Sequence, residues 1–139
     1  MYNIRKAKIE DWQAWQVYDP HIKKEEFINK VHTERALIIY EANKVIGVFR
    51  WNLFWDSLPC MTLLYFDEAY RRKGIGRKLL TYWENEMKKQ GYMAVMTSTQ
   101  VDEMSQHFYR KMGYKDCGGL VLDMPQLSQP MEMFLIKAL

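Results

Sequence analysis

The stretch Tyr70-Arg71-Arg72-Lys73-Gly74-Ile75-Gly76-Arg77-Lys78-Leu79-Leu80 predicts an anion-binding loop that leads into a helix. Its two glycines let backbone N–H groups approach an anion closely, because no Cβ stands in the way. The first turn of the helix adds unpaired N–H donors and the positive end of the helix dipole. The cations of 71–78 oppose that dipole and have no acid among them. A bound anion would remove the conflict.

Two nucleotide-binding motifs share part of this pattern but do not fit it. Gly74-Ile75-Gly76 begins the GxGxxG motif of dinucleotide-binding folds, but Leu79 stands where the third glycine is required. No Gly-Lys-Ser or Gly-Lys-Thr follows, which excludes a Walker A loop. The remaining alternative is ordinary turn chemistry at a basic helix start.

Hydrophobic periodicity in the rest of the chain predicts alternating strands and helices. Strands are expected at 2–7, 36–40, 45–51, 60–67, 92–98, 114–122 and 131–137. Helices are expected from Trp12, where Asp11 is the predicted cap, at 22–32, from Gly74 to Gly91, and at 103–112. The strand, helix and strand within 60–98 indicate one parallel crossover in a mixed sheet. The fold class is therefore α/β or α+β.

Length and composition predict a single domain, residues 1–139, with one hydrophobic core. The net charge of +3 permits an anionic ligand but does not require nucleic acid. Cys60 and Cys117 form no CxxC or zinc-binding pattern, so we expect neither a disulfide nor a metal site. The sequence shows no apolar signal region and no membrane-spanning run, so we expect a cytoplasmic protein that does not bind membranes.

A second motif, Asp102-Glu103-Met104-Ser105-Gln106-His107-Phe108-Tyr109-Arg110-Lys111-Met112-Gly113-Tyr114, follows the loop. Together with Arg-x-x-Gly-x-Gly at 71–76, it resembles the GCN5-related N-acetyltransferases (the GNAT superfamily). That family's helix reads Asn-x-x-Ala-x-x-Phe-Tyr-x-x-x-Gly-Phe; here Ser105 replaces the alanine and Asp102 the asparagine. The resemblance implies a mixed, mostly antiparallel sheet of six to seven strands, flanked by helices on both faces.

The resemblance also implies acetyl-CoA as co-substrate, with its pyrophosphate on the loop and its pantetheine arm along the preceding strand. The matching loop positions are Arg71, Arg72, Lys73, Gly74, Ile75, Gly76, Arg77 and Lys78. The matching positions on the strand and the second helix are Leu64, Tyr65, Phe66, Asp102, Ser105 and Tyr109.

By the same resemblance, Tyr109 is the general acid beside the sulfur, and a backbone N–H near Phe66 stabilises the oxyanion. A phenol of ordinary pKa, near 10, is protonated at pH 7 and can donate. Phe108 is expected to pack in the core. Cys60 and Cys117 have no neighbours in sequence that would lower their pKa, so both are interpreted as buried small residues. We therefore expect direct transfer in a ternary complex.

The general base is open. The family often uses a glutamate on the strand before the loop, but residues 60–66 contain no carboxylate. Asp56 is the candidate base, against the alternative of an ordinary loop aspartate. His107 is a second candidate, against the alternative of a surface histidine. Water acting on a partly deprotonated amine is a third solution. Asp67 and Glu68 are expected to serve the turn into the loop.

Aromatic residues before that strand predict an acceptor pocket. Trp51 and Trp55, with Asp56 nearby, would suit an amine with apolar or planar bulk; alternatively, the tryptophans pack on the sheet or at a dimer contact. The segment 123–130 is expected either to line the site or to form a homodimer contact.

The sequence thus predicts an acetyl-CoA-dependent N-acetyltransferase acting on an unidentified amine. One alternative is a catalytically weak acyl-CoA-binding or regulatory module, suggested by the missing strand carboxylate and by Asp102. The other is a nucleic-acid-binding protein, against which the low net charge argues.

Overall fold

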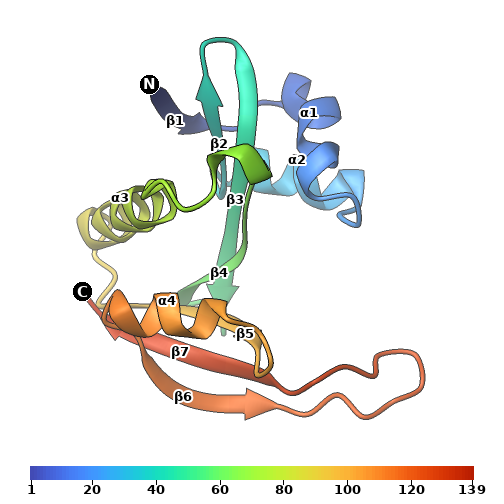
Figure 1. Ribbon diagram of the computed structural model, residues 1–139, viewed down its shortest axis with the longest axis vertical. Helices are drawn as coiled ribbons and strands as arrows, with labels where there is room; N and C mark the ends of the chain where they lie inside the picture. Colours follow the sequence, from blue (N-terminus) through green and yellow to red (C-terminus); the bar gives the residue numbers. More distant parts are fainter. The chain divides into compact units, whose positions relative to one another are not determined.

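The computed structural model describes residues 1–139, and the chain groups into two compact units (Figure 1). Unit 1 comprises Met1–Asn52 and Thr62–Thr81, and unit 2 comprises Leu53–Met61 and Tyr82–Leu139. In chain order the elements are β1 (Tyr2–Lys6), α1 (Trp12–Tyr18), α2 (Lys24–His32), β2 (Ala36–Glu41), β3 (Lys44–Phe54), β4 (Leu58–Phe66), α3 (Ile75–Lys89), β5 (Ala94–Gln100), α4 (Ser105–Lys111), β6 (Lys115–Leu120) and β7 (Glu132–Ala138). Two 3₁₀ turns, Ile9–Asp11 and Glu68–Tyr70, complete the list, so the predicted order of strands and helices is confirmed.

The seven strands pair in the order β1-β2-β3-β4-β5-β7-β6. β4 and β5 are parallel, with α3 as the crossover between them, whereas β1–β2, β2–β3, β5–β7 and β6–β7 are antiparallel. This confirms the predicted mixed, mostly antiparallel sheet with one parallel connection. No helix of the chain is both long enough and apolar enough to span a membrane.

The core of unit 1 is built on β2, whose apolar run is buried on both faces. Ala36 and Ile38 pack with Trp15 of α1 and Phe27 of α2. Side chains alternate along a strand, so the neighbouring buried residues of β2 point to the opposite face. Figure 1 shows α1 and α2 on one side of these strands and the first turns of α3 on the other. Continuous hydrophobicity at 36–39 is therefore explained by helices on both faces.

Polar anchors fix the helices of unit 1. Asp19, buried at the end of α1, accepts hydrogen bonds from Trp15 Nε1 at 3.0 Å and from Arg50 Nε of β3 at 2.8 Å. The predicted cap Asp11 does not bond α1 through its side chain. Its carboxylate instead accepts two bonds from Arg5 and one from the Lys8 N–H, which hold its pKa below the usual range.

In unit 2 both helices lie on one face of the strands. Alternate residues of β5 face α4: the Thr99 hydroxyl is 2.7 Å from the Ser105 hydroxyl, and Thr97 lies against Tyr109. The end of α3 is held on the same face by Glu84, which bonds Tyr114 after α4 and Lys137 of β7. Met96, one residue from Thr97, points to the opposite face. No helix of unit 2 covers that second face.

Candidate functional site

The turn that leaves β4 is held rigidly within unit 1. Asp67 caps the 3₁₀ turn, because its carboxylate accepts the Ala69 N–H at 3.1 Å, while its own N–H donates to the Ile46 carbonyl at 2.7 Å. The Tyr70 hydroxyl donates a hydrogen bond to the Glu41 carboxylate of β2 at 2.6 Å. Asp67 therefore serves the turn, as expected, and the following loop starts from a fixed point.

The loop itself depends on left-handed backbone. Arg72 has φ +61° and Gly74 has φ +77°, and these two residues redirect the chain from β4 into α3. A Cβ on Gly74 would meet no atom within 4 Å, so this glycine faces open space, and backbone conformation rather than packing requires it. Ile75 then anchors the start of α3, since only 2% of it is exposed.

The loop and the first turn of α3 present a continuous row of free donors. Residues 72–77 donate no backbone hydrogen bond; the first helical bond runs from the Lys78 N–H to the Gly74 carbonyl at 3.2 Å. No acidic residue lies in the first turn of the helix. Unpaired N–H groups and the positive end of the macrodipole together make an anion-binding surface.

The cations around this row are not neutralised. None of Arg71, Arg72, Lys73, Arg77 and Lys78 forms an ion pair. Three of them lie over aromatic rings of unit 1 instead, at 4.9 to 5.6 Å from ring centroid to cation: Arg71 over Tyr65, Lys73 over Tyr70 and Lys78 over Tyr2. Cation–π contacts hold these side chains near the loop without cancelling their charge. The field at the loop is therefore positive.

The strand before the loop offers free backbone groups. β4 pairs with β5 only at Cys60 and Met61, so residues 62–66 have no strand partner on that edge. Asp67 bonds β3, and the Tyr65 carbonyl points towards Gly47 of β3. Because the backbone groups of successive strand residues point to opposite edges, those of Leu64 and Phe66 point towards the unpaired edge. Arg71 Nε donates to the Phe66 carbonyl at 3.3 Å.

Tyr109 is the buried residue of α4. Its ring is 7% exposed and lies 5.9 Å from that of Tyr114. Burial raises the pKa of Tyr109 to about 12, although the neighbouring Thr97 hydroxyl acts in the opposite direction. The two hydroxyls do not reach the geometry of a full hydrogen bond, since the Thr97 oxygen has no partner. The phenol is therefore neutral at pH 7 and well above it.

Two expectations about burial were wrong. Phe108 was expected in the core, but it is only half-buried, and Tyr109 takes the inward position on this short helix. Cys117 was expected to be buried like Cys60, but it is exposed. β6 is the outermost strand of unit 2, and its outer position leaves the cysteine uncovered.

The other predicted residues divide between the units. In unit 2, Asp56 lies exposed on the turn between β3 and β4, while His107 is an exposed residue of α4. Asp102 is exposed in the turn before α4, and Ser105 bonds Thr99.

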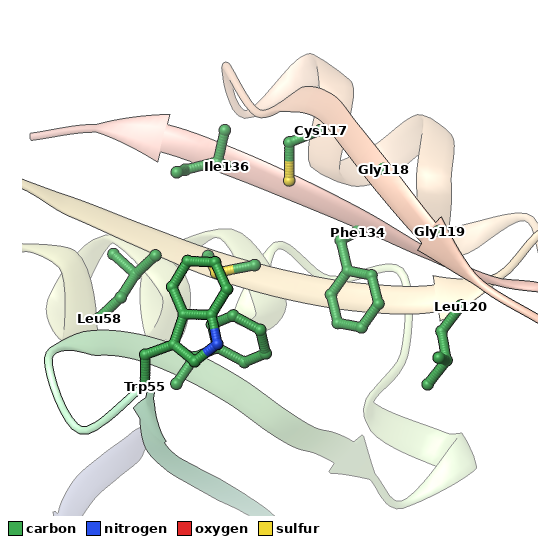
Figure 2. Close-up of a pocket in the computed structure, with 10 residues that line it drawn as sticks. Trp55, Leu58, Cys117, Gly118, Gly119, Leu120, Phe134 and Ile136 are labelled. Atoms are coloured by element: carbon green, nitrogen blue, oxygen red, sulfur yellow. The ribbon is translucent and has the colours of Figure 1, made fainter.

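The two tryptophans of the predicted acceptor pocket belong to different units. Trp51 belongs to unit 1, is 4% exposed and lies under the Arg35 guanidinium at 5.3 Å. Trp55 belongs to unit 2, is 81% exposed and lines a cavity there (Figure 2). The remaining walls of that cavity come from β5, β6 and β7, whose proximity no local sequence pattern indicates. The paired glycines 118–119 inside a strand were the available signal for a bulge.

Comparison with known proteins agrees with this architecture. The model of the Acetyltransferase (GNAT) family matches residues 1–114. No curated protein sequence matches the chain at a significant level.

Several solved structures share the fold over almost the full length of both chains. Ard1 from Thermoplasma volcanium has a TM-score of 0.85 at 16% identity, covering 99% of this chain and 97% of that one. The ribosomal-protein-S18-alanine N-acetyltransferase from Escherichia coli has a TM-score of 0.79 at 16% identity, covering 99% and 94%. A GNAT family acetyltransferase from Elizabethkingia anophelis with acetyl-CoA bound has a TM-score of 0.77 at 16% identity, covering 99% and 98%.

Proposed function

Because the chain belongs to the acetyltransferase (GNAT) family, we propose that it transfers the acetyl group of acetyl-CoA directly to an amine in a ternary complex. The observation that carries this proposal is the row of unpaired N–H groups at 72–77, set among cations without ion pairs. A pyrophosphate has the charge and the acceptor oxygens that such a row requires. The acetyl-CoA bound by the Elizabethkingia relative supports the choice of ligand.

Within unit 1, the strand and the loop divide the work of holding the co-substrate. The loop and the first turn of α3 hold the pyrophosphate. The free backbone groups of Leu64 and the Phe66 carbonyl hold the amide groups of the pantetheine arm as an added strand would. Arg71, which bonds the Phe66 carbonyl, must release it if that carbonyl is to accept a pantetheine N–H.

The reaction needs little covalent chemistry from the protein. The amine nitrogen attacks the thioester carbonyl carbon, the carbon–sulfur bond breaks, and the amine proton leaves to water or a base. A strand N–H at Phe66 is suited to the oxyanion, and the neutral phenol of Tyr109 is suited to donate to the departing sulfur. Holding the two reactants together supplies much of the rate, with effective molarities of about 10⁵ M or more.

Acetyl-CoA binding to a single-residue variant tests the proposal. Gly74→Glu puts a carboxylate and a strained left-handed residue into the anion site, so we expect calorimetry to detect no binding. Gly91→Glu is the matched control, because Gly91 has φ +92°, has no neighbour within 4 Å of a Cβ and lies at the opposite end of the same helix. Equal acetyl-CoA affinity in both variants, or no binding by the folded wild-type chain, would contradict the proposal.

A second candidate is an acyl-CoA-binding module that lacks turnover. It is favoured by one observation: β4 carries no carboxylate, and the nearest candidate base, Asp56, is exposed on a turn. Acetyl-CoA affinity without acetylation of any amine in a broad panel would support this candidate over the transferase.

A further inference from the structure

The uncovered face of unit 2 contains an apolar cavity of about 480 Å³ (Figure 2). Its floor is the side of the strands opposite α4, with Met96 of β5 and Phe134 and Ile136 of β7. One wall is the turn between β3 and β4, with Phe54, Trp55 and Leu58, and the other is β6 from Cys117 to Leu120. The volume falls within the range of small-molecule sites, about 300–1,000 Å³.

We propose that this cavity binds the planar aromatic or bulky apolar group of the acceptor amine. The assignment rests on the proposed transferase function and names the class of substrate that it takes. Three features of the cavity carry it: an outward-facing tryptophan in a strained turn, a bulge that shapes the facing wall, and the charge of the lining and its rim.

Trp55 has a strained backbone conformation. Trp55 and Asp56 have φ +53° and +58°, and they are the central residues of a turn in which the Ser57 N–H donates to the Phe54 carbonyl at 3.2 Å. Such turns favour asparagine, aspartate and glycine, and a bulky residue in the left-handed region is an outlier. The Trp55 indole is nevertheless 81% exposed while its ring lies 4.7 Å from that of Phe54. Strained backbone clusters at active sites and ligand clamps, so this exposed tryptophan beside the cavity is a candidate binding residue.

The opposite wall is shaped by a β-bulge. The register between β6 and β7 shifts between Asp116 and Gly118, so Cys117 is the extra residue. Gly118 has φ +146°, a left-handed value that glycine tolerates. Figure 2 shows the Cys117 sulfur, the Phe134 ring and the Trp55 indole facing one space, with Gly118 and Gly119 adding no side chain to the wall.

The charge pattern selects the ligand class. The lining contains no ionised side chain, so the group inside the cavity must be uncharged. Asp56, exposed on the same turn as Trp55, forms no ion pair and favours a cationic ligand at the rim. An amine whose aromatic part enters the cavity satisfies both conditions.

Alkylation of Cys117 reports whether the cavity is filled, without any need for turnover. Burial and the neighbouring Asp116 raise the pKa of this thiol, so iodoacetamide labelling is run at mildly alkaline pH. Cys60 stays unlabelled, because it is buried and its pKa is raised to about 11. Labelling rates at Cys117 are measured by peptide mass spectrometry with 2-naphthylmethylamine or with ethanolamine.

We expect 2-naphthylmethylamine, but not ethanolamine, to slow the labelling of Cys117 saturably. Trp55→Ala should weaken this protection roughly tenfold, since stacking on the indole is lost. Leu120→Asp, which adds a charge to the wall, should abolish it. Met93→Ala, at an exposed position of unit 2 outside the cavity, should leave it unchanged.

Three outcomes would overturn the assignment: no protection by the naphthyl amine, equal protection in Trp55→Ala and Met93→Ala, or labelling that falls as the chain dimerises in sedimentation experiments. Failure of the transferase proposal is seen separately. Protection of Cys117 without acetylation of any amine would leave the cavity assigned and the reaction wrong. Equal kcat/KM for naphthyl and small amines, without protection of Cys117, would support the transferase function but show that the cavity does not bind the acceptor.

Discussion

Burial changes the acidity of Tyr109, the proposed general acid. The phenol is removed from water and its pKa is raised to about 12, so it is neutral while the amine acceptor is partly deprotonated. A neutral phenol can donate to a sulfur on which negative charge develops, whereas a phenolate would repel it. Ionisation of the proposed acid therefore does not reduce the transferase activity at pH values below the pKa of Tyr109.

Tyr109→Phe should lower kcat by about 10²- to 10⁴-fold while the affinity for acetyl-CoA stays within a few-fold of wild type. The lost group is a proton donor, and the ring that packs beside Tyr114 is retained. Steady-state kinetics with calorimetry on the same samples separate the two effects. Tyr82→Phe, on the surface of α3, is the control; an unchanged kcat in Tyr109→Phe would remove Tyr109 from the mechanism.

Helix α3 joins the two units in sequence, and its second half is fixed in unit 2 by one buried carboxylate. Glu84 is 7% exposed and accepts hydrogen bonds from the Tyr114 hydroxyl at 2.7 Å and from Lys137 Nζ at 2.9 Å. Tyr114 follows α4 and Lys137 lies on β7, so this one residue ties three elements together. Burial and the Glu84 carboxylate raise the pKa of Tyr114 and keep it a donor.

Glu84→Ala should destabilise the fold by about 3–5 kcal/mol, because Tyr114 and Lys137 both lose the partner that offsets their burial. Glu86→Ala removes a surface pair with Lys89 from the same helix and should cost less than about 1 kcal/mol. Urea unfolding followed by circular dichroism gives both values. Similar losses in the two variants would mean that the buried cluster contributes no more than a surface pair.

Across the whole molecule, two kinds of buried group set the response of stability to alkaline pH. Lys30 donates to the Trp51 carbonyl at 2.8 Å, and burial, followed by repulsion from Arg50 and Arg35, lowers its pKa to about 8. Its unfolded pKa is 10.5, so between these values the unfolded chain holds more protons and stability rises with pH. Cys60, Tyr109 and Tyr114 act oppositely, because burial raises their pKa values above the unfolded values of 9 for the thiol and 10 for the phenols.

The melting temperature should therefore rise modestly from pH 8 to about 9, change little up to about pH 10, where Lys30 and Cys60 oppose each other, and then fall steeply towards pH 12. Lys30→Met should remove the rise, and Tyr109→Phe should reduce the fall, because each variant lacks the titrating group. Calorimetric scans across this pH range check both. A profile that is flat to pH 12 in the wild-type chain, or identical in all three proteins, would contradict the assignment.

The sequence predicted the order of the elements because their signals are local. Period-2 and period-3.6 patterns gave the strands and helices, and Gly91 and Gly113, both at positive φ, marked helix ends. Where several burial requirements competed, the sequence was less informative. Phe108 and Tyr109 are neighbours on a short helix, and only the packing against Thr97 and Tyr114 selects the tyrosine for the interior.

The proposed anion-binding loop thus rests on features of the sequence itself, since glycine conformation, helix polarity and cation spacing all lie within 71–78. The expected sheet also follows from local patterns joined by short connections. Only the tertiary structure decided that the cations are left without acidic partners, that burial raises the pKa of Tyr109, and that the Trp55 turn, β5, β6 and β7 enclose one cavity. Those properties depend on which distant residues exclude water from one another, and no local pattern specifies that.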